Sequence, residues 1–124
     1  MRIISGSNKG KKLIMPNDKI TRPLKDMAKE SIFNILAHSQ YINFHIKDSK
    51  VLDLFSGSGS FGIECLSRGV KKVYFFENYK PSIKVLGRNL SELEVNKNSV
   101  IREMDAYEIS KENFENEKIN LIFI

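Results

Sequence analysis

Apolar residues fall into short continuous runs that alternate with stretches of helical spacing along most of the chain. The runs at residues 51–55, 72–77, 100–103 and 119–124 predict strands. Apolar positions three or four residues apart predict helices from about residue 60 to 68 and from about residue 81 to 93. Strand–helix units that repeat in this way are typical of a parallel sheet with both faces covered. The sequence therefore predicts an α/β fold with a Rossmann-like sheet.

Residues 1–40 have a different pattern and precede this sheet. Short apolar stretches at residues 2–4 and 12–15 flank Gly6 and Gly10, which predicts a hairpin with lysines at its turn. A helix is expected from about residue 24 to 39, because apolar residues recur along one face. That stripe consists of Ala28, Ile32, Phe33, Ile35 and Leu36, and the polar residues off it are Lys25, Lys29 and Gln40. We therefore expect two units, a basic hairpin plus helix in residues 1–40 and an incomplete Rossmann-like domain in residues 41–124.

The net charge of +5 is concentrated at the beginning of the chain. Residues 1–30 contain eight basic residues against three acidic ones, whereas the remainder is electrically neutral. The basic residues are Arg2, Lys9, Lys11, Lys12, Lys19, Arg22, Lys25 and Lys29. A basic segment ahead of a neutral fold is the electrostatic pattern of a nucleic-acid contact. A solvated tail accounts for the charge equally well.

Several other classes of protein are disfavoured by the composition. No apolar run approaches the length of a membrane span, and the apolar start before the basic residues is too short for a signal peptide. The single cysteine, Cys65, excludes an internal disulfide and indicates a reducing compartment, so we expect a cytoplasmic protein. His38 and His45 have no metal-ligand spacing, so no metal site is expected.

The candidate ligand-binding residues are concentrated around a turn that contains glycines. Asp53 stands four residues before Gly57, the turn continues to Gly59, and Glu77 ends the next predicted strand. Glycines let the backbone approach a ligand, and an acid on the next strand can accept the ribose hydroxyls of a nucleoside-like cofactor. An acid at position 53 would repel a pyrophosphate, whereas it suits the cationic tail of S-adenosylmethionine. Together with Gly62 the turn also spells G-x-G-x-x-G, so a nicotinamide or flavin cofactor is the alternative.

The chain also resembles a particular methyltransferase family over nearly its whole length. The matching segments are residues 1–6, 9–13, 21–23, 33–36, 51–59, 66–69 and 76–77, together with Asp26, Lys29 and Glu30. These are similar to the bacterial RsmD-type 16S rRNA (guanine-N2)-methyltransferases, which have a class I methyltransferase sheet. Met27 departs from the pattern, because the family usually has Arg there.

The resemblance implies a role for each matching residue. In the family the acid at Asp53 lies beneath the methionine moiety, the two glycines give backbone access, and the acid at Glu77 accepts the ribose hydroxyls. The implied S-adenosyl-L-methionine contacts are Asp53, Ser56, Gly57, Gly59, Glu77, Asp105 and Ala106. Asp105 would contact the adenine amino group, although an aspartate that caps a turn or helix would look the same. The implied phosphate contacts are Arg2, Lys9, Lys11, Lys12 and Arg22, with 16S rRNA or an assembling small subunit as the partner.

The family's catalytic motif, Asn/Asp-Pro-Pro-Tyr/Phe, follows the fourth strand, and the sequence stops at Ile124, just before it. We therefore expect the sequence to be the cofactor half of a longer enzyme and to be inactive alone. Two alternatives stay open: a catalytically inactive fragment or paralogue that binds RNA, and a methyltransferase that acts on the amino group of DNA adenine.

Overall fold

The computed structural model describes residues 1–18, 24–110, 114 and 117–124. Its elements are α1 (Asp26–His38), β1 (Lys50–Asp53), α2 (Ser60–Ser67), β2 (Lys72–Glu77), α3 (Lys80–Glu92), the 3-10 helix η1 (Asn96–Asn98), β3 (Ser99–Glu103), the 3-10 helix η2 (Ala106–Glu108) and β4 (Leu121–Phe123). Within these described ranges no helix is both long enough and apolar enough to cross a membrane.

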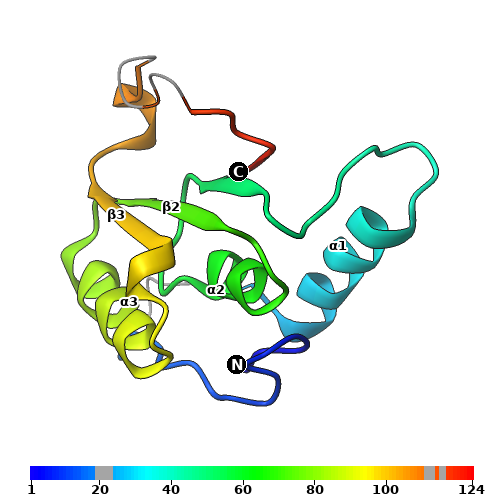
Figure 1. The fold of residues 1–124 in the computed structure, drawn as a ribbon. Coiled ribbons are helices and arrows are strands. Elements are labelled where there is room, and N and C mark those ends of the chain that lie inside the picture. Colours follow the sequence, from blue (N-terminus) through cyan, green and yellow to red (C-terminus); the bar gives the residue numbers. More distant parts are fainter. Residues whose placement is uncertain (19–23, 111–113, 115–116) are drawn as a thin grey trace.

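The four strands form one parallel sheet in the order β3-β2-β1-β4, and Figure 1 labels β2 and β3 within it. Because the strands are parallel, the carboxyl ends of β1, β2 and β3 lie along one edge of the sheet. The strand and helix positions match the sequence-based prediction to within about two residues, except at the two ends of the chain. The predicted α/β, Rossmann-like architecture is confirmed.

The two faces of the sheet are covered differently. On one face Val51, Val73 and Phe75 pack into the main core together with residues of α1, α2 and α3, and Figure 1 shows α2 between the other two helices. On the opposite face Leu52, Tyr74 and Phe76 are covered by partly buried side chains, most of them from segments that follow β3. In the part of the chain that the structure describes, that second face therefore lacks the helical layer expected for a doubly covered sheet.

The predicted hairpin is present in a reduced form. Its two arms meet at one antiparallel bridge between Arg2 and Lys12, and the N–H of Ile3 donates to the carbonyl of Lys11 at 2.9 Å. Ile3 and Leu13 are buried in the main core, so the hairpin is packed against the sheet domain. The division of the chain at residue 40 stays a prediction, although the two units share one core.

The predicted apolar stripe of α1 is wrong at three positions. Phe33 is fully buried and stacks on Phe61 with ring centroids 5.1 Å apart, as expected for a core residue. Ala28 and Ile35 are exposed, whereas Lys29, expected off the stripe, is completely buried. A buried ammonium is tolerated only where it is paired, and Glu64 provides that partner.

The fourth strand was expected at residues 119–124 as a central strand that is buried on both faces. The structure places a shorter β4 beside β1, and Phe123 stacks on Phe61 with ring centroids 3.8 Å apart. Ile122 and Ile124 are exposed, because no described residue packs over them. Within the described residues β4 pairs only with β1 and is an edge of the sheet.

Candidate cofactor site

A turn that we call the glycine loop, residues 54–59, connects β1 to α2 and is bound to the end of β2. The N–H of Ser56 donates to the carbonyl of Phe76 at 3.0 Å, and its hydroxyl donates to the carbonyl of Asp53 at 2.8 Å. The N–H of Gly59 donates to the carbonyl of Ser56 at 2.8 Å, which closes the turn. Ser56, one of the implied cofactor contacts, is therefore a buried part of the loop framework.

The two glycines of the loop serve different needs. Both have positive φ, +54° at Gly57 and +93° at Gly59, a backbone conformation that other residues rarely adopt. A Cβ at Gly59 would lie 2.5 Å from Leu86 Cδ1, so this glycine permits close packing of the loop on α3. A Cβ at Gly57 would meet nothing within 4 Å, so its backbone borders open space that a ligand could enter.

Asp53, the last residue of β1, is almost completely buried beneath this loop. Its Oδ2 accepts a hydrogen bond from the N–H of Gly62 at 3.2 Å. Burial raises the pKa of the Asp53 carboxyl to about 7, and the nearby Glu77 charge adds to that rise while the Gly62 N–H opposes it. A cation bound nearby would favour the ionised form. The position therefore fits a floor beneath a positively charged ligand group.

Glu77 ends β2 and faces the glycine loop. Its Oε1 accepts from the N–H of Gly57, and its Oε2 accepts from the N–H groups of Asn78 and Tyr79, each at 2.9 Å. A carboxylate offers about four lone-pair positions, so these donors leave about one for a ligand hydroxyl. A ligand that binds both oxygens must therefore displace or share a backbone N–H.

A small pocket next to Glu77 brings together three of the predicted cofactor residues. Glu77, Asp105 and Ala106 line it with the exposed Phe55, and its volume is about 30 Å³. That is roughly the volume of one water molecule, so an adenosine would lie mostly across the surface above it. Asp105 Oδ1 accepts from the N–H of Tyr107 at 2.9 Å, so the capping role considered for this residue is observed.

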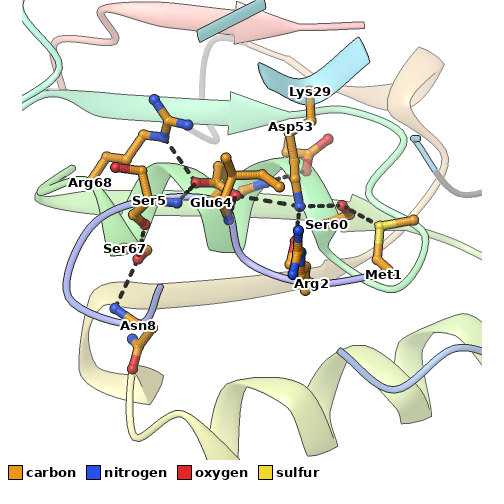
Figure 2. A network of polar contacts seen from close by, with 12 residues as sticks. Met1, Arg2, Ser5, Asn8, Lys29, Asp53, Ser60, Glu64, Ser67 and Arg68 are labelled. Atoms are coloured by element: carbon orange, nitrogen blue, oxygen red, sulfur yellow. Dashed lines mark hydrogen bonds and ion pairs between the residues drawn. The ribbon is translucent and has the colours of Figure 1, made fainter. Parts of the chain in front are cut away.

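The predicted phosphate contacts gather elsewhere. Arg2, Lys9, Lys11 and Lys12 are exposed on the hairpin, and Arg22 lies outside the described residues. Figure 2 shows the hairpin running along α2, from Met1 beside Ser60 to Asn8 beside Ser67. The hairpin tip therefore lies at the opposite end of α2 from the glycine loop, about 12 Å away at 1.5 Å per helical residue.

Sequence reasoning missed a buried polar network that joins the hairpin to α2 (Figure 2). Lys29 Nζ lies 3.4 Å from Glu64 Oε1 and donates to the carbonyl of Arg2 at 2.7 Å. The Glu64 carboxylate also accepts from the N–H of Ile4 at 2.8 Å, from the N–H of Ser5 at 3.0 Å and from Arg68 Nε at 2.9 Å. The available signal was Glu64, a charged residue inside the apolar run of α2, because a buried charge must have partners.

Asn89 on α3 is a second buried polar residue that the sequence did not single out. Its Oδ1 accepts from the N–H of Ile14 at 2.8 Å, and its Nδ2 donates to the carbonyls of Ile14 and Ser58 at 3.0 Å each. One amide thereby connects α3, the hairpin and the glycine loop.

The whole chain, residues 1–124, matches a family model described as Conserved hypothetical protein 95. YlbH from Bacillus subtilis is 40% identical over 106 residues, which cover 86% of this chain and 54% of YlbH. Ribosomal RNA small subunit methyltransferase D from Haemophilus influenzae is 43% identical over 94 residues, 76% of this chain and 46% of that protein. The chain thus spans about half the length of the curated relatives it matches.

Solved structures agree with the fold. The structure of yhhF from Escherichia coli superposes with a TM-score of 0.72 at 32% identity, covering 86% of this chain and 53% of that one. HI0767 from Haemophilus influenzae superposes with a TM-score of 0.61 at 34% identity, covering 84% of this chain and 51% of the other.

Proposed function

Because the chain belongs to the Conserved hypothetical protein 95 family, the RsmD-type family that its sequence resembles, we propose that it is the cofactor-binding part of an rRNA methyltransferase. The proposed cofactor is S-adenosyl-L-methionine. The proposed substrate is ribosomal RNA of the small subunit, which the name of the Haemophilus influenzae relative states for that protein.

One observation carries the proposal: two carboxylates that end neighbouring parallel strands lie at the glycine loop, and one glycine of that loop borders open space. Asp53 lies beneath the loop, Glu77 binds the N–H of Gly57 at 2.9 Å, and the Cβ position of Gly57 is open. Ligands of open α/β sheets bind outside the carboxyl ends of the strands, which is where these residues stand. Two acids beside one glycine loop favour a cationic ligand over a pyrophosphate.

The roles that we propose follow from this geometry. Asp53 stabilises the cationic methionine end, and the Glu77 carboxylate accepts from the ribose. Asp105 and Ala106 border the adenine. The remaining proposed contacts are Ser56, Gly57 and Gly59, which shape the loop.

The bound cofactor would supply an electrophilic methyl group, and an exocyclic guanine amino group is the proposed acceptor. We assign no catalytic residue within these 124 residues. Their proposed contribution is to bind and orient the methyl donor and to hold RNA through the basic hairpin. Phosphate contacts of that kind position an RNA without reading its sequence.

Calorimetry on the full-length protein tests the proposal. S-adenosylmethionine and its demethylated product should bind, and NAD should bind more weakly or not at all. Glu77→Ala should weaken S-adenosylmethionine binding by about tenfold or more, since hydrogen bonds to charged groups contribute about 1.5–3 kcal/mol. Glu103→Ala is the matched control, because Glu103 ends the neighbouring strand in register with Glu77 but lies on the exposed surface. Tighter binding of NAD, or equal effects of both substitutions, would refute the proposal.

A further inference from the structure

The glycine loop and the start of α2 are contacted on two sides. On each side the contacting groups either belong to the hairpin or bind to it. On one side Asn89 donates to the carbonyl of Ser58 while the same amide group pairs with both backbone groups of Ile14. Asn89 is 2% exposed, so these bonds form in the interior of the protein. The Ser58 hydroxyl also lies 3.3 Å from the sulfur of Met15, on the same arm of the hairpin.

On the other side, the first residue of α2 is bound by the opposite arm of the hairpin. Ser60 Oγ lies 3.1 Å from the sulfur of Met1 and 3.3 Å from Lys29 Nζ. The same Lys29 ammonium donates to the Arg2 carbonyl and pairs with Glu64, with no exposed surface on either side chain (Figure 2). The two arms of the hairpin therefore contact residue 58 of the loop and residue 60 at the start of α2, on either side of Gly59.

We propose that Asn89 and Lys29 are positioning residues for the methyl-donor site: they fix the glycine loop by tying it to the N-terminal hairpin. The hairpin then has a second role besides the proposed RNA contact, because it completes the support of the cofactor loop. This inference rests on the proposed function, and it assigns roles to residues that touch neither cofactor nor RNA.

The reason is geometric. Gly57 and Gly59 give the loop backbone a wide range of conformations, so its shape must be imposed by neighbours. The Ser58 carbonyl is the group between the two glycines, and Asn89 fixes its direction. This carbonyl shares a peptide group with the N–H of Gly59, which closes the turn on Ser56, so losing the bond frees that peptide group to rotate and loosens the turn that carries Gly57.

The test compares Asn89→Asp with Leu93→Ala in the full-length protein. Asn89→Asp keeps the size of the side chain and the acceptor for the Ile14 N–H, but it replaces the donor to the Ser58 and Ile14 carbonyls by an oxygen. Leu93 lies at the end of the same helix in the main core, so Leu93→Ala lowers stability without touching residues 58–60. Two properties are measured: the Kd for S-adenosylmethionine, and amide hydrogen exchange of residues 57–60.

Asn89→Asp should raise the Kd about tenfold and accelerate loop exchange by a similar factor, as expected when the hydrogen bonds of the Asn89 Nδ2 group are lost. Leu93→Ala should leave both within about twofold of wild type at a comparable fall in Tm. Lys29→Met removes the contact with Ser60 and should also accelerate amide exchange of the loop. This variant replaces Asn89→Asp in the test if Asn89→Asp does not fold.

Loop exchange at the wild-type rate in Asn89→Asp and Lys29→Met, or equal Kd changes in Asn89→Asp and Leu93→Ala, would overturn the inference. Amide hydrogen exchange of residues 57–60 tests the positioning role without any ligand. If the wild-type protein fails to bind S-adenosylmethionine, the proposed function is wrong, and faster loop exchange in Asn89→Asp would still show that Asn89 holds the loop.

Discussion

The buried carboxylate of Asp53 accepts a hydrogen bond from the N–H of Gly62 at 3.2 Å, which ties the last residue of β1 to the first turn of α2. The bond spans the base of the glycine loop, so the loop is closed from below by a charge-bearing group. A single N–H does not offset the desolvation of that group, and the pKa of Asp53 is accordingly raised to about 7.

The raised pKa predicts a pH-dependent stability. The folded protein binds a proton at Asp53 up to about pH 7, whereas the unfolded chain releases it near the ordinary value of 3.8. The free energy of unfolding should therefore fall as the pH rises through this window, by about 2–3 kcal/mol between about pH 5 and about pH 8. Asp53→Asn should lose this part of the slope, as measured by urea unfolding at several pH values. Parallel slopes in both proteins would contradict the assignment of this pH dependence to Asp53.

A second prediction concerns the buried pair of Lys29 and Glu64. Glu64→Leu leaves the Lys29 ammonium unpaired and removes the acceptor of the Ile4 and Ser5 N–H groups, so it should cost about 3–5 kcal/mol of unfolding free energy. The control is Lys80→Ala, which breaks the exposed ion pair with Glu103 and should cost at most about 1 kcal/mol. Chemical denaturation measures both, and similar costs would show that the buried pair is not a main support of the hairpin.

Replacing three glycines by alanine, one at a time, should distinguish an effect on stability from an effect on ligand binding. Gly59→Ala should destabilise by more than about 1–2 kcal/mol, because its positive φ and the nearby Leu86 side chain both oppose a Cβ. Gly57→Ala meets open space and should cost about 1 kcal/mol from φ alone, while weakening S-adenosylmethionine binding. Gly87→Ala, in the middle of α3 with nothing within 4 Å, should stabilise by about 0.5–1 kcal/mol. Thermal unfolding ranks the three variants, and the reverse order would show that the loop conformation is different.

The hairpin lysines give a prediction for RNA. Replacing Lys9, Lys11 and Lys12 by alanine should reduce the slope of log affinity against log salt by roughly two units, at about 0.7–0.9 per phosphate contact. All three side chains are exposed, so the fold should be retained. The matched control replaces Lys80, Lys84 and Lys97, which are exposed on or after α3. An unchanged slope in the hairpin variant, or an equal change in the control, would remove the hairpin from the RNA contact surface.

The sequence predicted the parts of this fold whose signal is local. The strand that ends at Asp53, the glycine loop and the strand that ends at Glu77 were all placed correctly, because apolar runs and glycines report directly on backbone geometry. Lys29 was misplaced because its burial depends on Glu64, which is far away in the chain and unreadable from helical spacing. Asn89 escaped notice for the same reason: a polar residue within a helix looks solvent-facing until its partner is known.

The state of β4 could not be predicted either. Ile122 and Ile124 are apolar in the sequence, and a run of apolar residues indicates a strand with both sides covered. The exposure of these two side chains depends on which other segments pack over the strand, and the sequence of the strand does not contain that information. The cofactor roles of Asp105 and Ala106 likewise stay predictions, although both residues line the same pocket as Glu77.

The contacts of the hairpin have a consequence for how the protein acquires its structure during synthesis. Ile4 bonds to a residue 60 positions later, and Ile14 bonds to one 75 positions later. These two bonds of the hairpin therefore cannot form until α2 and α3 have been translated. Contacts between such distant positions are slow to form, since a long loop must close first. The hairpin is thus made well before the helices that fix it, and its basic side chains stay free to meet other polyanions in the meantime.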